Sequence, residues 1–390
     1  MGPTVKLRPK ADARRIRFGH PWAWSDEIAF DRRTKALEPG TLVRLEENGG
    51  TPLGVAAMGG GARIAARVLD RDPDAEIDAG WIEARLRLAL DHRDRLYEGP
   101  FYRLIHAEAD GLPGVVVDRF GDAAVLQPNA AWAAEREEAF ADALSTLGMT
   151  TVIRSGTGRA RAEEGLDAET VVLRGDEPGQ IPVPMNGATY IADLMGGQKT
   201  GLFYDQRPNH AFAARLGQGT RVLDVFSHVG GFGLAALAGG AEEAVLLDAS
   251  RAALDLAEEG ARRMGRTVKT RQGDAFEALA ELAGGRFGLV VCDPPAFAPS
   301  KGARDAGLRA YERIARLSAP LVEDGGYLVL CSCSHAADLA AFRAASIRGI
   351  GRAGRTAQLI RTGFAGPDHP VHPALPESGY LKALFFRILA

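Results

Sequence analysis

The sequence contains few cysteines and no long apolar run. Its three cysteines all lie between residues 292 and 333, and an odd number confined to one region predicts no disulfide framework. No apolar stretch approaches the roughly 18 residues that a membrane-spanning helix needs, and the charged N-terminus lacks the apolar core of a secretory signal. These absences argue against a membrane protein and a secreted disulfide scaffold, and they predict a soluble cytoplasmic protein.

A large excess of positive charge is also missing. The formal net charge is -3, whereas nucleic-acid-binding domains usually carry a basic excess, so indiscriminate polyanion binding is not expected. Residues 1–35 nevertheless hold nine Lys and Arg against four Asp and Glu. This local excess fits either a phosphate-contacting patch or an ordinary solvated face, and charge alone does not separate the two.

What is present is ordinary globular material, 390 residues with 46% hydrophobic and 25% charged side chains, enough for two or three domains. Residues 1–72 contain short β-type pieces between Gly- and Pro-rich turns, which predicts a small β-rich domain. Residues 73–184 combine a helical period over 81–97 with two β-type runs flanking Arg119-Phe120-Gly121-Asp122, which predicts a small central α+β domain with a hairpin. The Pro- and Gly-rich segment 176–184 is the expected boundary.

Residues 185–390 show a third pattern, in which apolar strand-type runs alternate with helical segments. The strand-type runs are TRVLDVF, AEEAVLLDAS, FGLVVCDPP and GGYLVLCSCS. The alternation predicts a doubly wound, Rossmann-like α/β sheet, to which the apolar tail 380–390 would add its last strands. Ligands of such sheets bind beyond the carboxyl ends of the strands, so residues at those ends are the candidates for chemistry.

The first of these strands leads into a glycine-rich segment, 224–233, that runs from Asp224 to Gly233. Its glycines allow a ligand to approach the backbone closely before the next helix, which indicates a nucleotide-like cofactor. The dinucleotide fingerprint G-x-G-x-x-A also fits residues 231–236. In the dinucleotide fold, however, the first glycine directly follows the strand, whereas Gly230 comes four residues after Phe226. The loop by itself leaves a methyl donor and a dinucleotide equally open.

Acidic residues stand at the ends of the next strands. Asp248 is placed to accept hydrogen bonds from both ribose hydroxyls of either cofactor. Asp274 is placed to accept from an adenine amino group, and Ala275 can offer its backbone N–H. Asp274 equally fits a helix N-cap, and the two roles can coexist.

The segment Asp293-Pro294-Pro295 follows the strand FGLVVC. Two prolines stiffen this acidic turn, which forms no part of the dinucleotide pattern and favours a site where a base meets a methyl donor. On the next strand, Cys331 and Cys333 point to the same side, with Cys333 further out toward the cleft. Cys331 and Cys292 lie inside apolar strands and are expected to be buried small hydrophobes.

At this point the chain resembles the bacterial 23S ribosomal RNA large-subunit methyltransferase I family, which makes 5-methylcytosine. The resemblance covers nearly the whole chain. It rests on HPWAWSDEI, AEADGLPGVVVDRFGDAAVLQ, QKTGLFYDQRPNH, DVFSHVGGFGLAAL, DPPAF, CSCS, DHPVHP and PESGYLKAL, in that order. It implies an RNA-binding PUA-like domain over 1–72, a central domain over 73–184 and a Rossmann-like methyltransferase domain over 185–390. It further implies S-adenosyl-L-methionine as cofactor, 23S rRNA or a large-subunit assembly particle as partner, and neither a metal nor a membrane.

The resemblance also assigns site residues. Cofactor contacts are implied for Phe203, Asp205, Arg207, Asp224, Phe226, Ser227, Gly230, Asp248, Asp274, Ala275, Asp293 and Pro294, and catalytic roles for Asp293 and Cys333. An internal ion pair is the alternative for Asp205 and Arg207. The Cys333 thiolate would add to carbon 6 of cytosine so that carbon 5 can accept the methyl group. The second cysteine of better-known two-cysteine RNA methyltransferases is Ala296 here, so the elimination base stays open among Lys301, His335 and water.

Other functions stay open at this level. One is methylation of an exocyclic amino nitrogen, although the aromatic residue of the usual motif comes one position late, as Phe297. Another is a non-catalytic rRNA-binding assembly protein. A dinucleotide oxidoreductase fits poorly with DPPAF and CSCS. Phe297 is the nearest aromatic residue to a base swung out of its stack, and a homodimer is compatible with the sequence.

Overall fold

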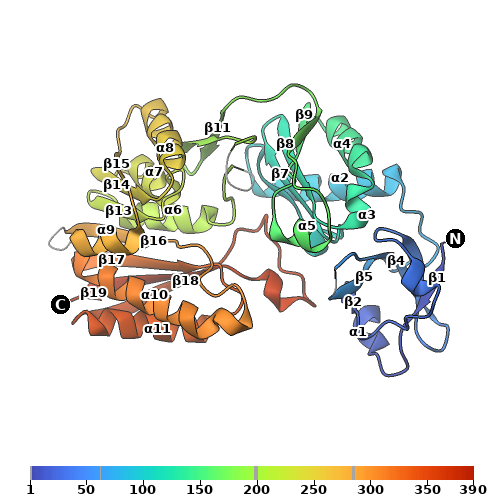
Figure 1. Ribbon diagram of the computed structural model, residues 1–390. Coiled ribbons are helices and arrows are strands. Elements are labelled where there is room, and N and C mark those ends of the chain that lie inside the picture. The colour runs from blue at the N-terminus through green and yellow to red at the C-terminus, as the bar shows by residue number, and fades with distance from the viewer. Residues whose placement is uncertain (1, 62, 197–200, 283–285) are drawn as a thin grey trace. The chain divides into compact units, whose positions relative to one another are not determined.

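The computed structural model describes residues 2–61, 63–196, 201–282 and 286–390. The chain divides into two compact units, each of which is discontinuous in sequence (Figure 1). Unit 1 comprises Met1–Gly179, Leu194–Thr200 and Pro367–Ser378, and unit 2 comprises Gln180–Asp193, Gly201–Gly366 and Gly379–Ala390. The three-domain division therefore remains a prediction. Within the described residues, no helix has both the length and the apolar character that crossing a bilayer requires.

The N-terminal part of unit 1 is β-rich. Its sheet has the order β1-β3-β4-β5-β2, with a short helix α1 (Ala13–Arg17) and a 3-10 turn η1 (Thr34–Ala36) beside it. The strands are β1 (Thr4–Lys6), β2 (Trp22–Trp24), β3 (Leu42–Glu46), β4 (Pro52–Met58) and β5 (Ile64–Asp70). Apolar side chains of this region form a core of their own, to which Val43, Leu45 and Ile16 contribute. Burial alternates along β3, as expected for a strand with one covered face, whereas β4 and β5 are buried along most of their length.

The rest of unit 1 is built on a second sheet, of order β10-β9-β8-β7-β6. Its strands are β6 (Phe101–His106), β7 (Val115–Phe120), β8 (Ala123–Pro128), β9 (Thr151–Arg154) and β10 (Val171–Arg174), and its helices are α2 (Ala79–Leu96), α3 (Ala131–Ala134), α4 (Glu137–Thr146), α5 (Arg159–Glu163) and the 3-10 turn η2 (Ala107–Asp110). The predicted hairpin is confirmed, because Phe120 pairs with Ala123 across a two-residue turn. The Asp78 side chain caps α2 by accepting from the Trp81 amide at 2.7 Å.

A late segment of the chain, Pro367–Ser378 with the 3-10 turn η5 (Pro376–Ser378), is anchored within unit 1 by a buried charge network. Arg93 makes a bidentate pair with Asp110, at 2.7 Å for both bonds. The Arg93 guanidinium also donates to the Asp368 carbonyl at 3.0 Å, and the Arg103 amide donates to the Asp368 carboxylate at 3.1 Å. Because the Arg93 side chain is fully buried, loss of one partner would leave an uncompensated charge.

Unit 2 contains a seven-stranded sheet of order β15-β14-β13-β16-β17-β19-β18. Its strands are β13 (Arg221–Val225), β14 (Glu243–Asp248), β15 (Lys269–Gln272), β16 (Phe287–Cys292), β17 (Val322–Ser332), β18 (Thr356–Gly363) and β19 (Lys382–Leu389), and a hairpin of β11 (Ile181–Met185) and β12 (Ala188–Ala192) precedes them. The strands from β15 to β17 are parallel, and β19 runs antiparallel to both of its neighbours. The strand order reverses between β13 and β16, where open α/β sheets bind their ligands.

Helices cover both faces of this sheet, as a doubly wound fold requires (Figure 1). They are α6 (Arg207–Leu216), α7 (Gly231–Ala238) and α8 (Arg251–Arg263) on one face, and α9 (Ala275–Glu281), α10 (Arg304–Ser318) and α11 (Leu339–Arg352) on the other, with 3-10 turns η3 (Lys301–Ala303) and η4 (Ala319–Leu321) beside α10. Strand β16 is buried along its whole length, which explains why its sequence is a continuous apolar run rather than an alternating one.

Candidate functional site

The predicted site residues gather at one edge of the unit 2 sheet. Phe226, Ser227 and Gly230 follow β13, Asp248 ends β14, Asp274 and Ala275 follow β15, Asp293 and Pro294 follow β16, and Cys333 follows β17. Because these strands are parallel, their carboxyl ends lie along the same edge. Their placement is therefore the expected one, and their individual roles are still predictions.

The loop after β13 has a strained backbone. Phe226 and His228 have φ values of 62° and 49°, a region that side chains other than glycine rarely adopt. Gly230 has a φ of 84°, and a Cβ there would lie 2.9 Å from the Leu234 side chain. Gly230 and Gly231 donate to the Ser227 carbonyl at 2.8 and 3.3 Å, so a tight turn leads directly into α7. The first amides of α7 consequently face the sheet edge, where a helix favours electron-rich ligand groups.

Asp224, in strand β13, holds the loop through a hydrogen bond with the start of α7. Its carboxylate is buried in the sheet and accepts the Gly233 amide at 2.8 Å. The pKa of Asp224 is raised to about 7: burial is the main cause and the charge of Asp248 adds to it, whereas hydrogen bonds from the Gly233 and Phe232 amides act in the opposite direction. The Asp224 side chain therefore helps to set the shape of the loop, and its predicted contact with a cofactor stays a prediction.

Asp248 also ties the loop to the sheet. Its Oδ2 accepts the His228 amide at 2.8 Å, and its Oδ1 accepts the Ser250 amide at 2.9 Å. A carboxylate has about four acceptor positions, so each oxygen can accept a further donor. The partly exposed Asp248 can thus bind two vicinal hydroxyl groups while it holds the loop.

Asp274 forms the N-cap of α9, as its alternative interpretation predicts. Its Oδ1 accepts the amides of Phe276 and Glu277 at 2.8 and 3.1 Å. Both bonds use the same oxygen, so the exposed carboxylate keeps Oδ2 for another donor as far as the described residues go. Ala275, the first residue of α9, is buried beside it.

The segment that carries Phe203, Asp205 and Arg207 reaches the same edge. The Phe203 ring meets the His228 ring edge-on at a centroid distance of 5.1 Å, which brings this segment to the glycine loop. The buried Asp205 carboxylate accepts the Tyr380 hydroxyl at 2.7 Å. Arg207 begins α6, and its guanidinium lies 5.5 Å from the centre of the Tyr204 ring. Asp205 therefore serves to fasten two distant segments of unit 2.

The three thiols differ in accessibility. Cys292 and Cys331 are buried within their strands, and Cys333, the first residue after β17, is partly exposed. Burial raises the pKa of Cys292 to about 12 and raises the pKa of Cys331 well above its usual range. These two thiols are chemically inert in the folded chain, so Cys333 is the cysteine that a substrate can reach.

The loop after β16 is joined to the loop after β17 by a hydroxyl network. The Asp293 amide donates to the Val225 carbonyl at 3.2 Å, which fixes the start of the Asp293-Pro294 turn. The Ser334 hydroxyl accepts the Ala298 amide at 3.0 Å and lies 2.8 Å from the Tyr311 hydroxyl. Ser332 donates to the same Tyr311 oxygen at 2.9 Å. Asp293 and Cys333 thus stand on loops that share one buried anchor.

Sequence reasoning misses four residues of this region: Tyr311, Ser334, Tyr380 and Lys382. Tyr311 lies within a helix, where no motif marks it. Lys382 lies in the segment PESGYLKAL and interrupts the otherwise apolar tail YLKALFF, but neither signal shows which segment its side chain contacts. In the structure, Lys382 donates to the Ser334 carbonyl at 2.7 Å.

Phe297 packs against other aromatic rings instead of projecting from the surface. Its half-buried ring lies 6.2 Å from Phe226, 6.0 Å from Phe276 and 5.1 Å from Tyr311, measured between ring centres. This aromatic cluster connects the loops after β13 and β16 with α9 and α10. The ring therefore shapes the wall of the site, and its role opposite a swung-out base remains a prediction.

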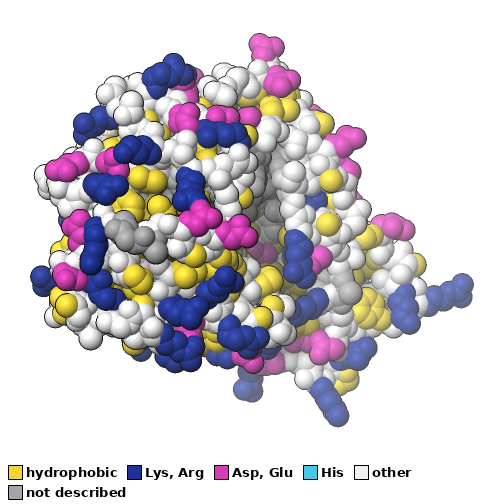
Figure 2. Space-filling model, turned by 60° about the vertical axis from the view of Figure 1, so that its left-hand side comes forward, with side chains coloured by type: hydrophobic (Ala, Val, Ile, Leu, Met, Phe, Trp, Pro, Cys, Tyr) yellow, Lys and Arg dark blue, Asp and Glu magenta, His cyan; other side chains and the backbone are white. Residues whose placement is uncertain are grey.

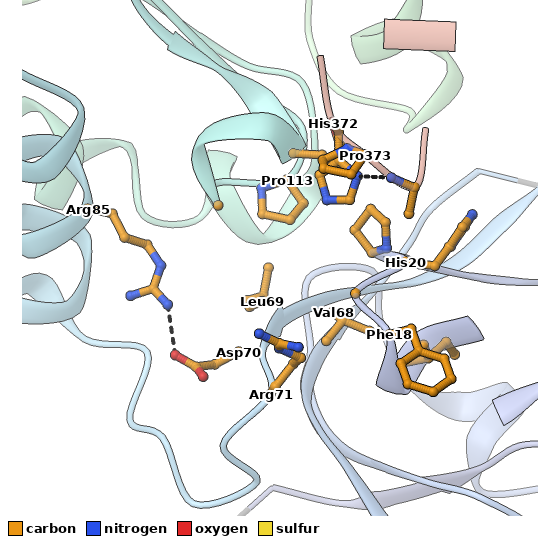
Figure 3. Close-up of a pocket in the computed structure, with 16 residues that line it drawn as sticks. Phe18, His20, Val68, Leu69, Asp70, Arg71, Arg85, Pro113, His372 and Pro373 are labelled. Atoms are coloured by element: carbon orange, nitrogen blue, oxygen red, sulfur yellow. Dashed lines mark hydrogen bonds and ion pairs between the residues drawn. The ribbon is translucent and has the colours of Figure 1, made fainter. Parts of the chain in front are cut away.

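Unit 1 has a separate concavity of about 560 Å³ (Figure 3). His20 lines it from the segment after α1, and His372 from the Pro367–Ser378 segment. Arg85 is paired with Asp70 at 2.8 Å on one side of the pocket, and Phe18 lies on the other. The Phe18 ring is 84% exposed. Exposed aromatic rings of this kind are platforms on which an unpaired base can stack.

The basic N-terminal cluster is only partly neutralised. Lys6, Arg15, Arg17 and Arg33 form ion pairs with acidic neighbours. For the remaining cations of residues 1–35, the described part of the chain shows no ion pair. These cations are compatible with a phosphate-contacting patch and with an ordinary solvated face. Elsewhere the charges are mixed: Figure 2 shows Lys and Arg side chains interspersed with Asp and Glu on the face in view.

Comparisons with known proteins agree with this architecture. Residues 163–387 match the family of S-adenosylmethionine-dependent methyltransferases, and residues 5–71 match a PUA-like domain. Among solved structures, a proposed SAM-dependent methyltransferase from Streptococcus mutans superposes with a TM-score of 0.81 at 17% identity, covering 99% of this chain and 100% of that one. A second structure with the same TM-score and 18% identity, covering 99% of each chain, is described as a complex with SAH. At these identities the likeness shows the fold alone, which is Rossmann-like in unit 2.

Curated relatives extend the match to nearly the full chain. Ribosomal RNA large subunit methyltransferase I of Aeromonas salmonicida is 36% identical, with 98% of both chains covered. The protein of the same name from Erwinia tasmaniensis is 34% identical, with 99% of this chain and 98% of the relative covered. With a PUA-like domain, a Rossmann-like fold and this likeness over its whole length, the chain belongs to the S-adenosylmethionine-dependent ribosomal RNA large subunit methyltransferase I family.

Proposed function

We propose that this protein transfers a methyl group from S-adenosylmethionine to carbon 5 of a cytosine in 23S rRNA, through a covalent adduct with Cys333. The observation that carries the proposal is the position of Cys333. Of the three cysteines, all within the described residues, it alone is partly exposed, and its loop shares the Tyr311 anchor with the loop of Asp293. A reachable thiol beside a carboxyl group is what methylation of a ring carbon needs, whereas methylation of an amino nitrogen needs no thiol.

The residues at the sheet edge fit the cofactor. Asp248 has acceptor capacity for ribose hydroxyls and Asp274 keeps one oxygen for an amino group. The buried Ser227 hydroxyl has no hydrogen-bond partner in the described structure, which is a cost unless a ligand supplies one. Gly230 and the first turn of α7 leave the backbone accessible. When bound, S-adenosylmethionine would supply an electrophilic methyl group.

The chemistry follows from the two catalytic candidates. The Cys333 thiolate attacks carbon 6 of the cytosine, a bond forms between sulfur and carbon 6, and the electron pair moves toward carbon 5. Asp293 in its acid form donates a proton to ring nitrogen 3 and so neutralises the charge that develops there. Carbon 5 would then take the methyl group while the bond between that group and the donor sulfur breaks, which would leave S-adenosylhomocysteine. A base removes the proton from carbon 5, the carbon–sulfur bond breaks, nitrogen 3 returns its proton, and Cys333 leaves as thiolate.

Several residues remain candidates for that base. Lys301 lies in η3 after the Asp293 loop, and His335 follows Cys333 by two residues. Water is the third candidate. The His335 ring lies 5.8 Å from the Tyr380 ring, and the choice of base among the three candidates stays open.

Unit 1 is proposed to bind the RNA. Its PUA-like region supplies Phe18 at the edge of the concavity, with Arg71 as an exposed cation in the lining. A stacked base and a nearby phosphate would use both groups. The partners expected from the sequence, 23S rRNA or a large-subunit assembly particle, are compatible with such a surface.

The test uses 23S rRNA transcribed with 5-fluorocytidine, incubated with the protein and S-adenosylmethionine. Fluorine replaces the proton that elimination must remove, so the adduct persists and resists denaturation. We expect an RNA-linked band for the wild type and no band for Cys333→Ala. Cys331→Ala, which changes the buried thiol two residues earlier at the end of β17, is the matched control and should give the wild-type band. Methyl transfer to normal RNA without any adduct would overturn the proposal and point to an amino nitrogen.

A further inference from the structure

Lys382 is a buried cation in an apolar part of unit 2. Its side chain sits at the start of β19 and the residue is 6% exposed. Its ammonium donates to the Ser334 carbonyl at 2.7 Å, and within the described residues it forms no ion pair with a carboxylate. A buried ammonium is costly unless an anion compensates it. The Lys382 ammonium would therefore be stabilised by a nearby anion other than an Asp or Glu side chain.

The strand register shows where that partner lies. Lys382 is paired with Ser332, the last residue of β17, and Cys333 comes next in the chain. The ammonium holds the carbonyl of Ser334, the residue after Cys333. It is thus bound to the turn that carries the thiol. Burial lowers the pKa of Lys382, and the negative charges of Cys333 and Asp338 raise it.

The other groups around this turn are already engaged or neutral. Asp338 is exposed, caps α11 through the Ala341 amide at 2.8 Å and accepts from Arg304 at 3.1 Å. On α10, the Tyr311 hydroxyl bonds Ser332 and Ser334, and burial raises the pKa of Tyr311, so it stays neutral. The buried Cys331 thiol also stays neutral, because burial raises its pKa. His335 faces the Tyr380 ring.

We propose that Lys382 is a positioning residue that keeps Cys333 in its thiolate form, by holding a desolvated ammonium against the turn that carries the thiol. The inference rests on the proposed role of Cys333 as nucleophile. An ammonium and a thiolate stabilise each other in a low-dielectric setting, and thiolates are the reactive form of cysteine. The hydrogen bond to Ser334 fixes the geometry, and the charge sets the protonation state.

The test measures the thiolate directly in the full-length protein, without RNA. The rate of Cys333 alkylation by iodoacetamide is followed against pH, and the modified peptide is quantified by mass spectrometry so that the buried thiols do not interfere. We expect Lys382→Met to raise the midpoint of the pH–rate curve for Cys333 alkylation by about one pH unit or more. The alkylation rate near neutral pH then falls about tenfold. Lys382→Arg should keep the wild-type midpoint, and Arg387→Met, on the same strand, is the matched control.

A second neutral variant separates the loss of charge from a loss of folding. Lys382→Gln keeps a donor for the Ser334 carbonyl but loses the charge, so it should shift the midpoint as Lys382→Met does, with an unchanged melting temperature. An unshifted midpoint in a folded neutral variant overturns the inference. Retention of the 5-fluorocytidine adduct by Cys333→Ala would instead remove the proposed nucleophile and leave the thiolate result standing, so the two failures are distinguishable.

Discussion

The Ser334 hydroxyl accepts the backbone amide of Ala298 at 3.0 Å, across 36 positions of sequence. This bond joins the loop after β17, which presents Cys333, to the loop after β16, which presents Asp293. The Tyr311 hydroxyl, 2.8 Å from the same oxygen, completes the anchor from α10. The hydroxyl groups of Ser334 and Tyr311 therefore fix how the two loops lie relative to each other, and with them the positions of the Cys333 thiol and the Asp293 carboxyl group.

Tyr311→Phe should loosen both loops at once. The change removes the oxygen shared by Ser332 and Ser334, at a cost of about 1 kcal/mol for each lost hydrogen bond. We expect kcat for methyl transfer to fall about tenfold while KM for S-adenosylmethionine changes much less, because most of the predicted cofactor residues lie on loops that this hydroxyl network does not touch. Steady-state kinetics check this, with Tyr327→Phe in the middle of β17 as control. An equal effect on both constants would contradict the anchor.

Asp224 should make the protein less stable as pH rises. Its folded pKa of about 7 lies above its usual unfolded value, so between about pH 4 and pH 7 the folded state holds a proton that the unfolded state has lost. Stability from this group is present at low pH and declines by up to about 4 kcal/mol as pH rises through that window. Asp224→Asn can still accept the Gly233 amide and should flatten the profile. Urea unfolding at several pH values measures it, and identical slopes for both proteins would refute the assignment.

Asp248→Asn should weaken cofactor binding. The substitution removes the charge that strengthens bonds to ribose hydroxyls and leaves one oxygen acceptor for the amides of His228 and Ser250. A loss of about 1.4 kcal/mol corresponds to a tenfold higher Kd. Isothermal titration with S-adenosylmethionine gives the value, and Asp255→Asn on the exposed side of α8 should bind as the wild type does. Equal Kd values for the two variants would exclude the ribose contact.

Phe18→Ala should reduce RNA affinity without affecting the fold. A stacked base contributes about 1 to 3 kcal/mol, so we expect at least a fivefold weaker Kd for a 23S rRNA fragment. The ring is 84% exposed, which means that truncation removes little core packing. Leu88→Ala, an exposed apolar residue on α2, is the control in a filter-binding assay. If the two variants bind alike, the concavity is not an RNA contact.

The sequence predicts the sheet edge well because its signals are local there. A parallel strand followed by a polar residue places that residue at the carboxyl edge whatever the order of the strands, which is why Asp248, Asp274, Asp293 and Cys333 come together as expected. The hairpin at Phe120 and Ala123 is equally local. For Asp274 the helix cap is visible in the sequence as well.

Contacts between distant segments escape the same reasoning. Lys382 reaches Ser334 across 48 positions, and only the antiparallel placement of β19 beside β17 brings them together. The Arg93 contact with Asp368 spans 275 positions and assigns a segment of the late chain to unit 1. The motif predicts a cofactor contact for Asp224, and that contact stays a prediction; the burial of the carboxylate and its bond to the Gly233 amide depend on packing that the motif does not encode.

The place of β19 has a consequence for biosynthesis. This strand is inserted between β17 and β18, both of which precede it in the chain. On the ribosome, β18 has no partner strand until residues 382–389 have emerged, and until then the Ser334 carbonyl lacks its bond from Lys382. A nascent chain can therefore form the glycine loop long before it can form the contact that we propose to activate Cys333, so on that proposal the thiol becomes reactive only after the sheet has closed.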